Sequence, residues 1–154
     1  SLTNEEFLEF LRAAMGRLGA GAARFCFEIT ETAAIANIGA AETFIRELRA
    51  LGCKFSLDDF GSGLSSFGYL KQLPVDHLKI DGVFIRDLLS DPVDYALVRA
   101  INEVGKTLGK TTIAEFVENA EVRAKLAELG VDCVQGYGVG RPRPLLELLQ
   151  PVAV

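Results

Sequence analysis

Two adjacent aspartates, Asp58 and Asp59, stand between an apolar run and a glycine-rich turn in the stretch "KFSLDDFGSG" (54–63). Two carboxylates this close repel each other, so they require a cation, a shared proton or full solvation. Consecutive side chains of a strand point to opposite faces, so the pair can share one cation only if the strand ends there. The glycine-rich turn over 60–63 is expected to supply that end, because glycine tolerates a tight backbone. We therefore interpret the two aspartates as metal ligands.

Polar residues also follow the other short β-prone runs of the chain. In a parallel α/β sheet, the carboxyl ends of the strands share one edge, and sites are built at that edge. Five consecutive strands would bring acids, one lysine and one amide to a single rim: Glu28 and Glu31, Asp58 and Asp59, Lys79 and Asp81, Glu115 and Glu118, and Gln135.

The chemistry expected of this rim is metal-dependent hydrolysis. Carboxylate oxygens suit a hard divalent cation such as Mg²⁺ or Mn²⁺. Zinc is disfavoured, because the lone histidine, His77, lies within a predicted strand rather than at its end. Two cations about 4 Å apart would clamp a scissile phosphate and acidify a water between them. Lys79 could hold that water or accept its proton.

Each of these residues also has an ordinary explanation. A single acid after a strand is commonly a helix cap or a solvated loop residue. Asp81 before Gly82 could only make a turn, and Lys79 alone could be a surface lysine. Phosphoryl-accepting receiver domains also place an acidic pair, another aspartate and a lysine at strand ends. In that fold the acidic pair follows the first strand, whereas here an acidic strand end precedes it, so we favour the hydrolase interpretation.

The elements that must position these residues alternate between strands and helices. Strands are predicted over 24–30, 53–59, 76–81, 110–116 and 132–138. Helices are predicted from a capping box at Thr3 and Glu6 through Leu18, then over 33–51, 64–72, 94–108 and 119–129, with a last short helix after Pro142 and Pro144. The fold class is therefore α/β, a parallel sheet covered by helices.

Composition narrows the function classes. The 154 residues fit one domain, and no segment resembles a membrane span or a signal peptide. A net charge of −5 argues against a DNA-binding surface. The three cysteines, Cys26, Cys53 and Cys133, lack metal-ligand spacing, and we expect them to be reduced core residues of a cytoplasmic protein.

The motifs resemble those of the EAL family of bacterial cyclic-di-GMP phosphodiesterases. The matching stretches are "FEITET" (27–32), "LDDFGSG" (57–63), "LPVDHLKID" (73–81), "IAEFVE" (113–118) and "QGYGVGRP" (135–142). The resemblance implies a TIM-barrel-like (β/α) fold and two ions, Mg²⁺ or Mn²⁺. It also implies cleavage of cyclic-di-GMP to linear pGpG, a homodimer, and further signalling domains such as GGDEF or PAS in the parent protein.

The resemblance also assigns roles to individual residues. Glu28, Asp58, Asp59 and Glu115 would be metal ligands, and Lys79 would orient or deprotonate the attacking water. Glu31 would support the loop after the aspartate pair. Glu115 and Glu118 would assist catalysis, while Asp81 and Gln135 would contact substrate. Phe116 stands where the commoner motif has glycine, and both flanking glutamates are retained.

The resemblance covers only part of the family's barrel. The chain, 1–154, corresponds to the fourth to eighth β/α units, so an incomplete barrel of about five strands is expected. The Glu-Ala-Leu signature and two metal ligands lie outside it, and the isolated chain is expected to be inactive. Alternating residues of Phe25–Ile29 and Phe55–Leu57 are expected to form an apolar, uncovered inner face. A degenerate module that binds cyclic-di-GMP as a receptor, or serves only in dimerisation, is the alternative function.

Overall fold

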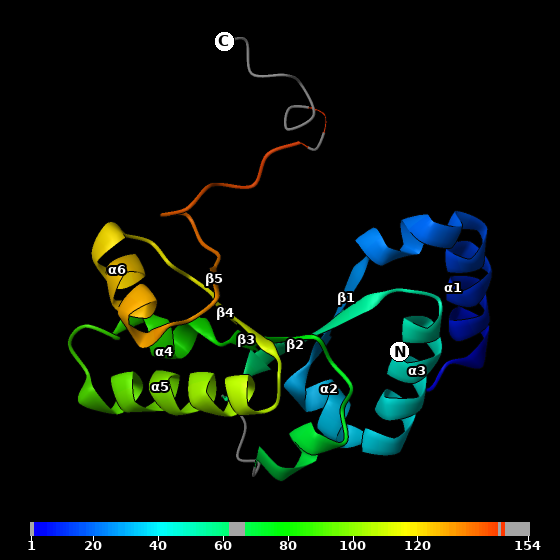
Figure 1. Ribbon diagram of the computed structural model, residues 1–154, viewed down its shortest axis with the longest axis horizontal. Helices are drawn as coiled ribbons and strands as arrows, with labels where there is room; N and C mark the ends of the chain where they lie inside the picture. The colour runs from blue at the N-terminus through cyan, green and yellow to red at the C-terminus, as the bar shows by residue number, and fades with distance from the viewer. Residues whose placement is uncertain (1, 62–66, 145, 147–154) are drawn as a thin grey trace.

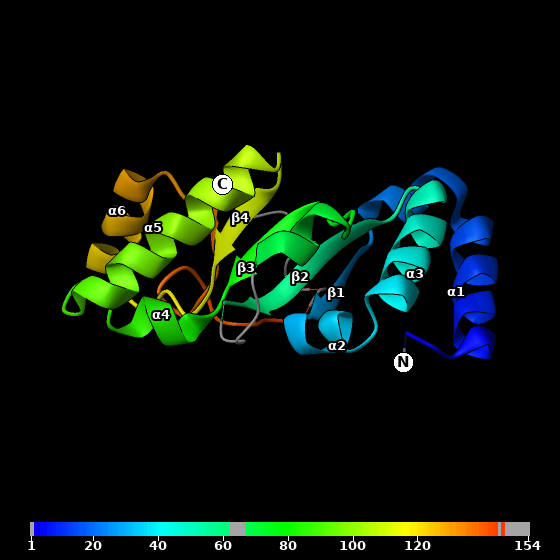
Figure 2. The same cartoon turned by 90° about the horizontal axis from the view of Figure 1, so that it is seen from below.

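A parallel five-stranded sheet organises the computed structural model, which describes residues 2–61, 67–144 and 146. The strands lie side by side in chain order, as Figures 1 and 2 show. This order confirms the predicted α/β fold, and the sheet does not close into a barrel within the described residues. The strands are β1 Cys26–Thr30, β2 Lys54–Phe60, β3 His77–Ile80, β4 Thr111–Ala114 and β5 Cys133–Val134.

Helices connect successive strands, and most begin at a residue whose side chain caps a free backbone N–H group. Asn4, Asn37 and Asn119 each accept a hydrogen bond from the backbone three residues ahead. The helices are α1 Glu5–Leu18, α2 Glu31–Ala36, α3 Ile38–Ala50, α4 Gly82–Arg86, α5 Pro92–Thr107 and α6 Ala120–Leu129, with 3₁₀ turns η1 Gly19–Arg24 and η2 Phe67–Lys71. No helix in the described part of the chain is long and apolar enough to cross a membrane.

Several predicted boundaries differ from the structure. The helix expected over 33–51 is two helices, because Asn37 leaves helical geometry (φ −154°) and caps α3 instead. Asn4, not Thr3, caps α1. Residues 132–138 contain only a two-residue strand, and α4 was not predicted at all. The short helix expected after Pro144 lies mainly outside the described residues, as does the start of the one expected over 64–72.

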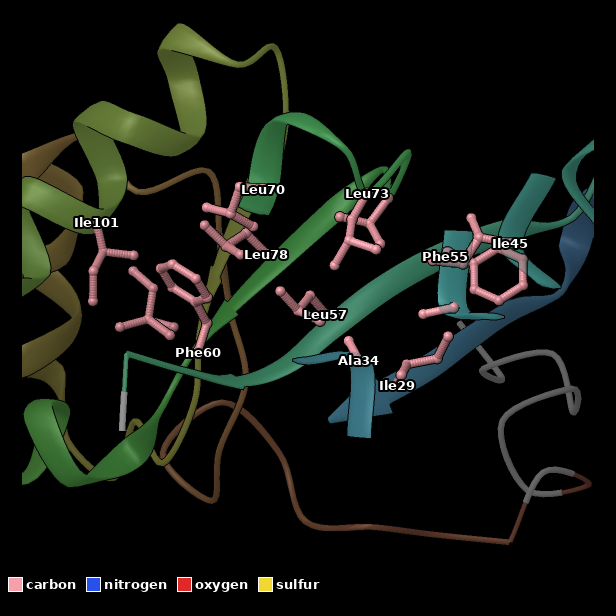
Figure 3. Packing of buried hydrophobic residues seen from close by; sticks show 14 of the residues in the cluster. Ile29, Ala34, Ile45, Phe55, Leu57, Phe60, Leu70, Leu73, Leu78 and Ile101 are labelled. Atoms are coloured by element: carbon pink, nitrogen blue, oxygen red, sulfur yellow. The ribbon is translucent and has the colours of Figure 1, made fainter. Parts of the chain in front are cut away.

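The hydrophobic core lies between the helices and one face of the sheet. Phe55 and Leu57 point into it and are fully buried, and Figure 3 shows them among side chains from α3 and η2. Burying each of these large apolar side chains contributes about 2 kcal/mol. The expectation that Phe55 and Leu57 line the inner face is therefore wrong. Side chains alternate along a strand, so Ser56 and Asp58 occupy that face instead.

The same alternation corrects the prediction for the cysteines. Cys53 precedes β2 and is buried, but Cys26 and Cys133 are exposed, and all three thiols are free. Cys26 shares a face of β1 with Glu28, opposite to buried Ile29. Cys133 lies on β5, which pairs with β4 at the edge of the described sheet. These two cysteines therefore lie outside the helix-covered core.

Candidate metal centre

A bulge in β2, rather than the end of the strand, brings the two aspartates to one site. Leu57 pairs with Leu78 and Phe60 with Ile80, so β2 uses one more residue than β3 over this interval. The strand ends at Phe60, one residue later than predicted, Gly61 is in a turn, and residues 62 and 63 of the expected break lie outside the described residues. Asp59 adopts a left-handed backbone with φ 55°. An extra residue in such a bulge re-aims its side chain, so Asp58 and Asp59 need not point to opposite faces.

Three carboxylates meet beside this bulge. Asp58, Asp59 and Glu115 each offer an oxygen within 4.8 Å of the other two. Asp59 is exposed, and the other two side chains are partly buried. An all-oxygen, acidic donor set fits Mg²⁺ or Mn²⁺ better than softer metals. The three residues, predicted separately from two strand ends, therefore form a candidate site for a hard cation.

Lys79 lies at the centre of the acidic cluster. Its Nζ is 2.8 Å from Asp58 Oδ1, 2.8 Å from Glu115 Oε1 and 3.2 Å from Glu28 Oε2. The side chain is only 4% exposed, so its charge is removed from bulk water. A buried ammonium group requires such partners, because an unpaired charge in the interior costs several kcal/mol, on the order of the stability of a domain.

The electrostatics of the cluster follow from burial and these contacts. Burial alone would lower the pKa of Lys79, but hydrogen bonds to Asp58 and Glu115 outweigh it and raise the pKa. Burial raises the pKa of Glu115, against the opposing effect of Lys79. The pKa of Asp59 is raised by desolvation and then by the charges of Asp58 and Asp81. A bound cation would relieve the repulsion between these neighbouring carboxyl groups that contributes to the raised pKa values.

Glu28 belongs to the cluster through Lys79. Its partner in register on β2 is Ser56, and its carboxylate is half exposed. It is not among the three carboxylates that lie within 4.8 Å of one another. The structure therefore brings Glu28 to the rim, beside Asp58, without placing it in the tightest group.

Glu31, the residue expected to support the loop, is the first residue of α2 and is 3% exposed. Its Oε2 accepts the backbone N–H of Gly61 at 3.0 Å. Its Oε1 accepts the hydroxyl of Tyr69 at 2.5 Å. The carboxylate therefore contacts the chain directly after the aspartate bulge, as its predicted role requires. Tyr69 was not predicted, since nothing in the sequence links it to a residue 38 positions earlier.

Glu118 and Gln135 meet across a hollow beside Glu115. The backbones of 117 and 135 hydrogen-bond at 3.0 Å, and Gly138 N–H reaches Val117 O at 2.8 Å. A Cβ atom on Gly136 would lie 2.3 Å from Val117 N, so this close approach requires glycine. The hollow has a volume of about 290 Å³, and its lining consists of Glu115, Phe116, Glu118, Gln135, Gly136 and Tyr137.

Two aromatic residues of this hollow were not predicted as site residues. Phe116 is 51% exposed and has φ 54°, a conformation that is costly for an aromatic residue. Its ring covers Gly82, whose missing Cβ would lie 2.1 Å from it, and the Arg86 guanidinium lies 5.1 Å from the ring centroid. Tyr137 is 63% exposed. The unusual backbone of Phe116 only becomes visible in the structure.

Asp81 has a clear structural role at the rim. Its side chain accepts the N–H of Val83 at 3.0 Å and so caps α4. Its charge also contributes to the raised pKa of Asp59, so it lies within electrostatic range of the acidic cluster. The structure thus supports the turn explanation for Asp81 without assigning it a substrate contact.

The EAL domain family matches residues 1–142, and the chain belongs to this family. Its fold is accordingly TIM-barrel-like, with the five described strands forming an open portion of such a sheet. The family match accounts for the acidic rim, because the described strands present their polar residues at the edge expected for a barrel site.

Similar proteins include enzymes that act on a cyclic dinucleotide. The cyclic di-GMP phosphodiesterase PdeB of Shewanella oneidensis is 52% identical over 120 residues, which are 78% of this chain and 14% of PdeB. The bifunctional diguanylate cyclase/cyclic di-GMP phosphodiesterase MucR of Pseudomonas aeruginosa is 39% identical over 146 residues, which are 95% of this chain and 21% of MucR.

A solved structure matches the described fold closely. The PaMucR phosphodiesterase in complex with c-di-GMP has a TM-score of 0.89 and 37% sequence identity, covering 96% of this chain and 60% of that chain. The present chain thus spans less than two thirds of the relatives that it matches.

Proposed function

We propose that this chain is part of a metal-dependent phosphodiesterase domain that hydrolyses cyclic-di-GMP to linear pGpG in the bacterial cytoplasm. The observation that carries the proposal is the group of Asp58, Asp59 and Glu115 around buried Lys79. Relatives named as cyclic di-GMP phosphodiesterases supply the substrate class.

The proposed roles follow the geometry. Asp58, Asp59 and Glu115 would hold Mg²⁺ or Mn²⁺, with Glu28 completing the shell from β1. A bound divalent cation polarises the phosphoryl oxygen and lowers the pKa of a bound water. Lys79, held as an ammonium by ion pairs of 2.8 Å to Asp58 and Glu115, would orient the attacking water through an N–H group rather than take its proton.

The hollow next to Glu115 is the proposed place for the substrate. Glu118 and Gln135 offer hydrogen-bonding groups there, and Phe116 and Tyr137 offer aromatic surface. Flat apolar surface combined with a few polar groups suits a nucleobase. Asp81 would act at this rim mainly through its cap of α4 and its charge.

The chain would correspond to the fourth to eighth β/α units of the family barrel. We therefore propose that residues 1–154 alone do not turn over substrate, and that catalysis requires a complete EAL domain containing this chain. The complete domain would act as a homodimer joined to other signalling domains. The alternative, a receptor without hydrolysis, is less well supported because the acidic cluster and Lys79 are all retained.

Asp59→Asn tests the proposal in a complete EAL domain that contains this chain. The substitution keeps the volume of the side chain and removes its charge, so we expect pGpG formation in Mn²⁺ to fall to background while the protein stays folded. Glu103→Gln, an exposed change on α5, is the matched control. Parental pGpG formation by Asp59→Asn would refute the metal assignment, and tight binding without turnover in the parent would favour the receptor.

A further inference from the structure

The carboxylate of Glu31 links two parts of the chain that flank the aspartate bulge. One oxygen accepts the N–H of Gly61 and the other accepts the hydroxyl of Tyr69. Gly61 lies two residues after Asp59, and Tyr69 lies on η2. A carboxylate that is 3% exposed must have its oxygens satisfied, because desolvation of an unpaired charge is costly.

The buried hydroxyl of Tyr69 donates a hydrogen bond to Glu31 and stays protonated. Its side chain is 8% exposed, and burial together with the hydrogen bond to Glu31 raises the pKa of its hydroxyl. The hydroxyl therefore keeps its proton at physiological pH. It donates to a carboxylate oxygen that is itself buried, so loss of the hydroxyl would leave that oxygen without this donor.

A second contact joins the same two parts of the chain. The rings of Phe60 and Phe67 lie 5.3 Å apart, directly next to Gly61 and two residues before Tyr69. Phe60 is fully buried, so this contact is anchored in the core. Aromatic contact and paired hydrogen bonds therefore act together on the backbone that leaves the bulge.

We propose that Tyr69 is a positioning residue for the metal centre, acting through Glu31 and Gly61 on Asp59. This role rests on the proposed function. Without the Tyr69 hydroxyl, the Glu31 side chain loses one of the two hydrogen bonds that the described residues donate to it, and its hydrogen bond to Gly61 loosens. The left-handed backbone of Asp59 persists only while its surroundings hold it, so the carboxylate would move from the position shared with Asp58 and Glu115.

The decisive variant is Tyr69→Phe in a complete EAL domain that contains this chain. It removes one hydroxyl and keeps the buried ring. We expect the Mn²⁺ concentration for half-maximal turnover to rise by about tenfold or more, the usual effect of an outer-shell change on metal affinity. Turnover at saturating Mn²⁺ should remain within about threefold of the parent. Tyr95→Phe, on α5 and outside the hydrogen bonds that join Glu31, Gly61 and Tyr69, is the matched control and should leave both values unchanged.

A readout without metal tests the contact separately. Amide hydrogen exchange at Gly61 should be faster in Tyr69→Phe, while exchange in β3 stays as in the parent. In a Glu31→Gln background, Tyr69→Phe should add little to the loss in Mn²⁺ response, because both changes break the same link.

Any of the following four results would overturn the inference. An unchanged Mn²⁺ response with a lower Tm would make Tyr69 purely structural. Unchanged exchange at Gly61 would show that Tyr69 does not act through Glu31. A parent that binds no Mn²⁺ would overturn this role together with the proposed function, whereas a parent that binds Mn²⁺ and a variant that matches it would overturn this role alone.

Discussion

Two buried charged groups at the same rim are stabilised in opposite ways. Lys79 is surrounded by the carboxylates of Glu28, Asp58 and Glu115, so charge balances charge. Glu31 instead accepts hydrogen bonds from the neutral donors Gly61 N–H and Tyr69 hydroxyl. The first arrangement leaves carboxylates that a divalent cation can bind, and the second arrangement fixes backbone. At this rim, the carboxylates around Lys79 can therefore bind a cation, whereas the hydrogen bonds of Glu31 fix the backbone.

Replacing Lys79 should have the largest effect, because it removes the common partner of Glu28, Asp58 and Glu115. Lys79→Met keeps the apolar stem and removes the ammonium, leaving partly buried carboxylates without their common partner. We expect a loss of about 3 kcal/mol in the free energy of unfolding without metal. Turnover should fall by about 10²–10⁴-fold, the range for loss of a group that moves or positions a proton. Urea unfolding and steady-state kinetics measure the two effects.

Added Mn²⁺ should distinguish the two arrangements. Because a cation can neutralise the carboxylates around position 79, Mn²⁺ should recover much of the stability that Lys79→Met loses. Glu31→Gln should lose stability that Mn²⁺ does not recover, since its partners are neutral donors. Lys54→Met, which replaces an exposed lysine on the same sheet, serves as the control. Equal recovery of stability in Lys79→Met and Glu31→Gln would show that the Lys79 cluster and the Glu31 contacts do not respond to Mn²⁺ independently.

The cluster around Lys79 could be predicted from the sequence, whereas the contacts of Glu31 could be predicted only in part. The rule that parallel strands end at one edge placed Asp58, Lys79 and Glu115 together, and the ion pairs confirm that they meet. The bulge at Asp59 depends on the register between β2 and β3, which no local pattern encodes.

Long-range contacts and side-chain faces were the other limits. The hydroxyl of Tyr69 reaches Glu31 only after the sheet has formed. The face on which Phe55 lies could not be assigned, because alternation separates two faces without saying which one the helices cover. Helix caps were predictable in kind, but Asn37 showed that one asparagine can divide a continuous helical pattern.

Alkaline pH should weaken the hydrogen bond between Tyr69 and Glu31. The folded-state pKa of Tyr69 is raised above its ordinary value of 10.0, so its hydroxyl contributes stability that is fully present below pH 10.0. That contribution is lost as pH rises towards and through the folded-state pKa. The difference in unfolding free energy between the parent and Tyr69→Phe should therefore shrink between about pH 9 and pH 11. Urea unfolding at both pH values tests this, and a constant difference would contradict it.

The smallest expected effect concerns Phe116, which, like Asp59, is a non-glycine residue with a left-handed backbone in the described part of the chain. Phe116→Gly would relieve strain of about 1 kcal/mol and lose a cation–π contact with Arg86 of similar size, so stability should change little.

If the Phe116 ring lines the substrate hollow, KM for cyclic-di-GMP should still rise by about tenfold in Phe116→Gly, in line with about 1–3 kcal/mol for base stacking. Arg86→Ala, which removes only the guanidinium, should leave KM near the parental value. An unchanged KM in Phe116→Gly would assign the ring to packing over Gly82, and a large fall in Tm would show that this packing outweighs the backbone strain.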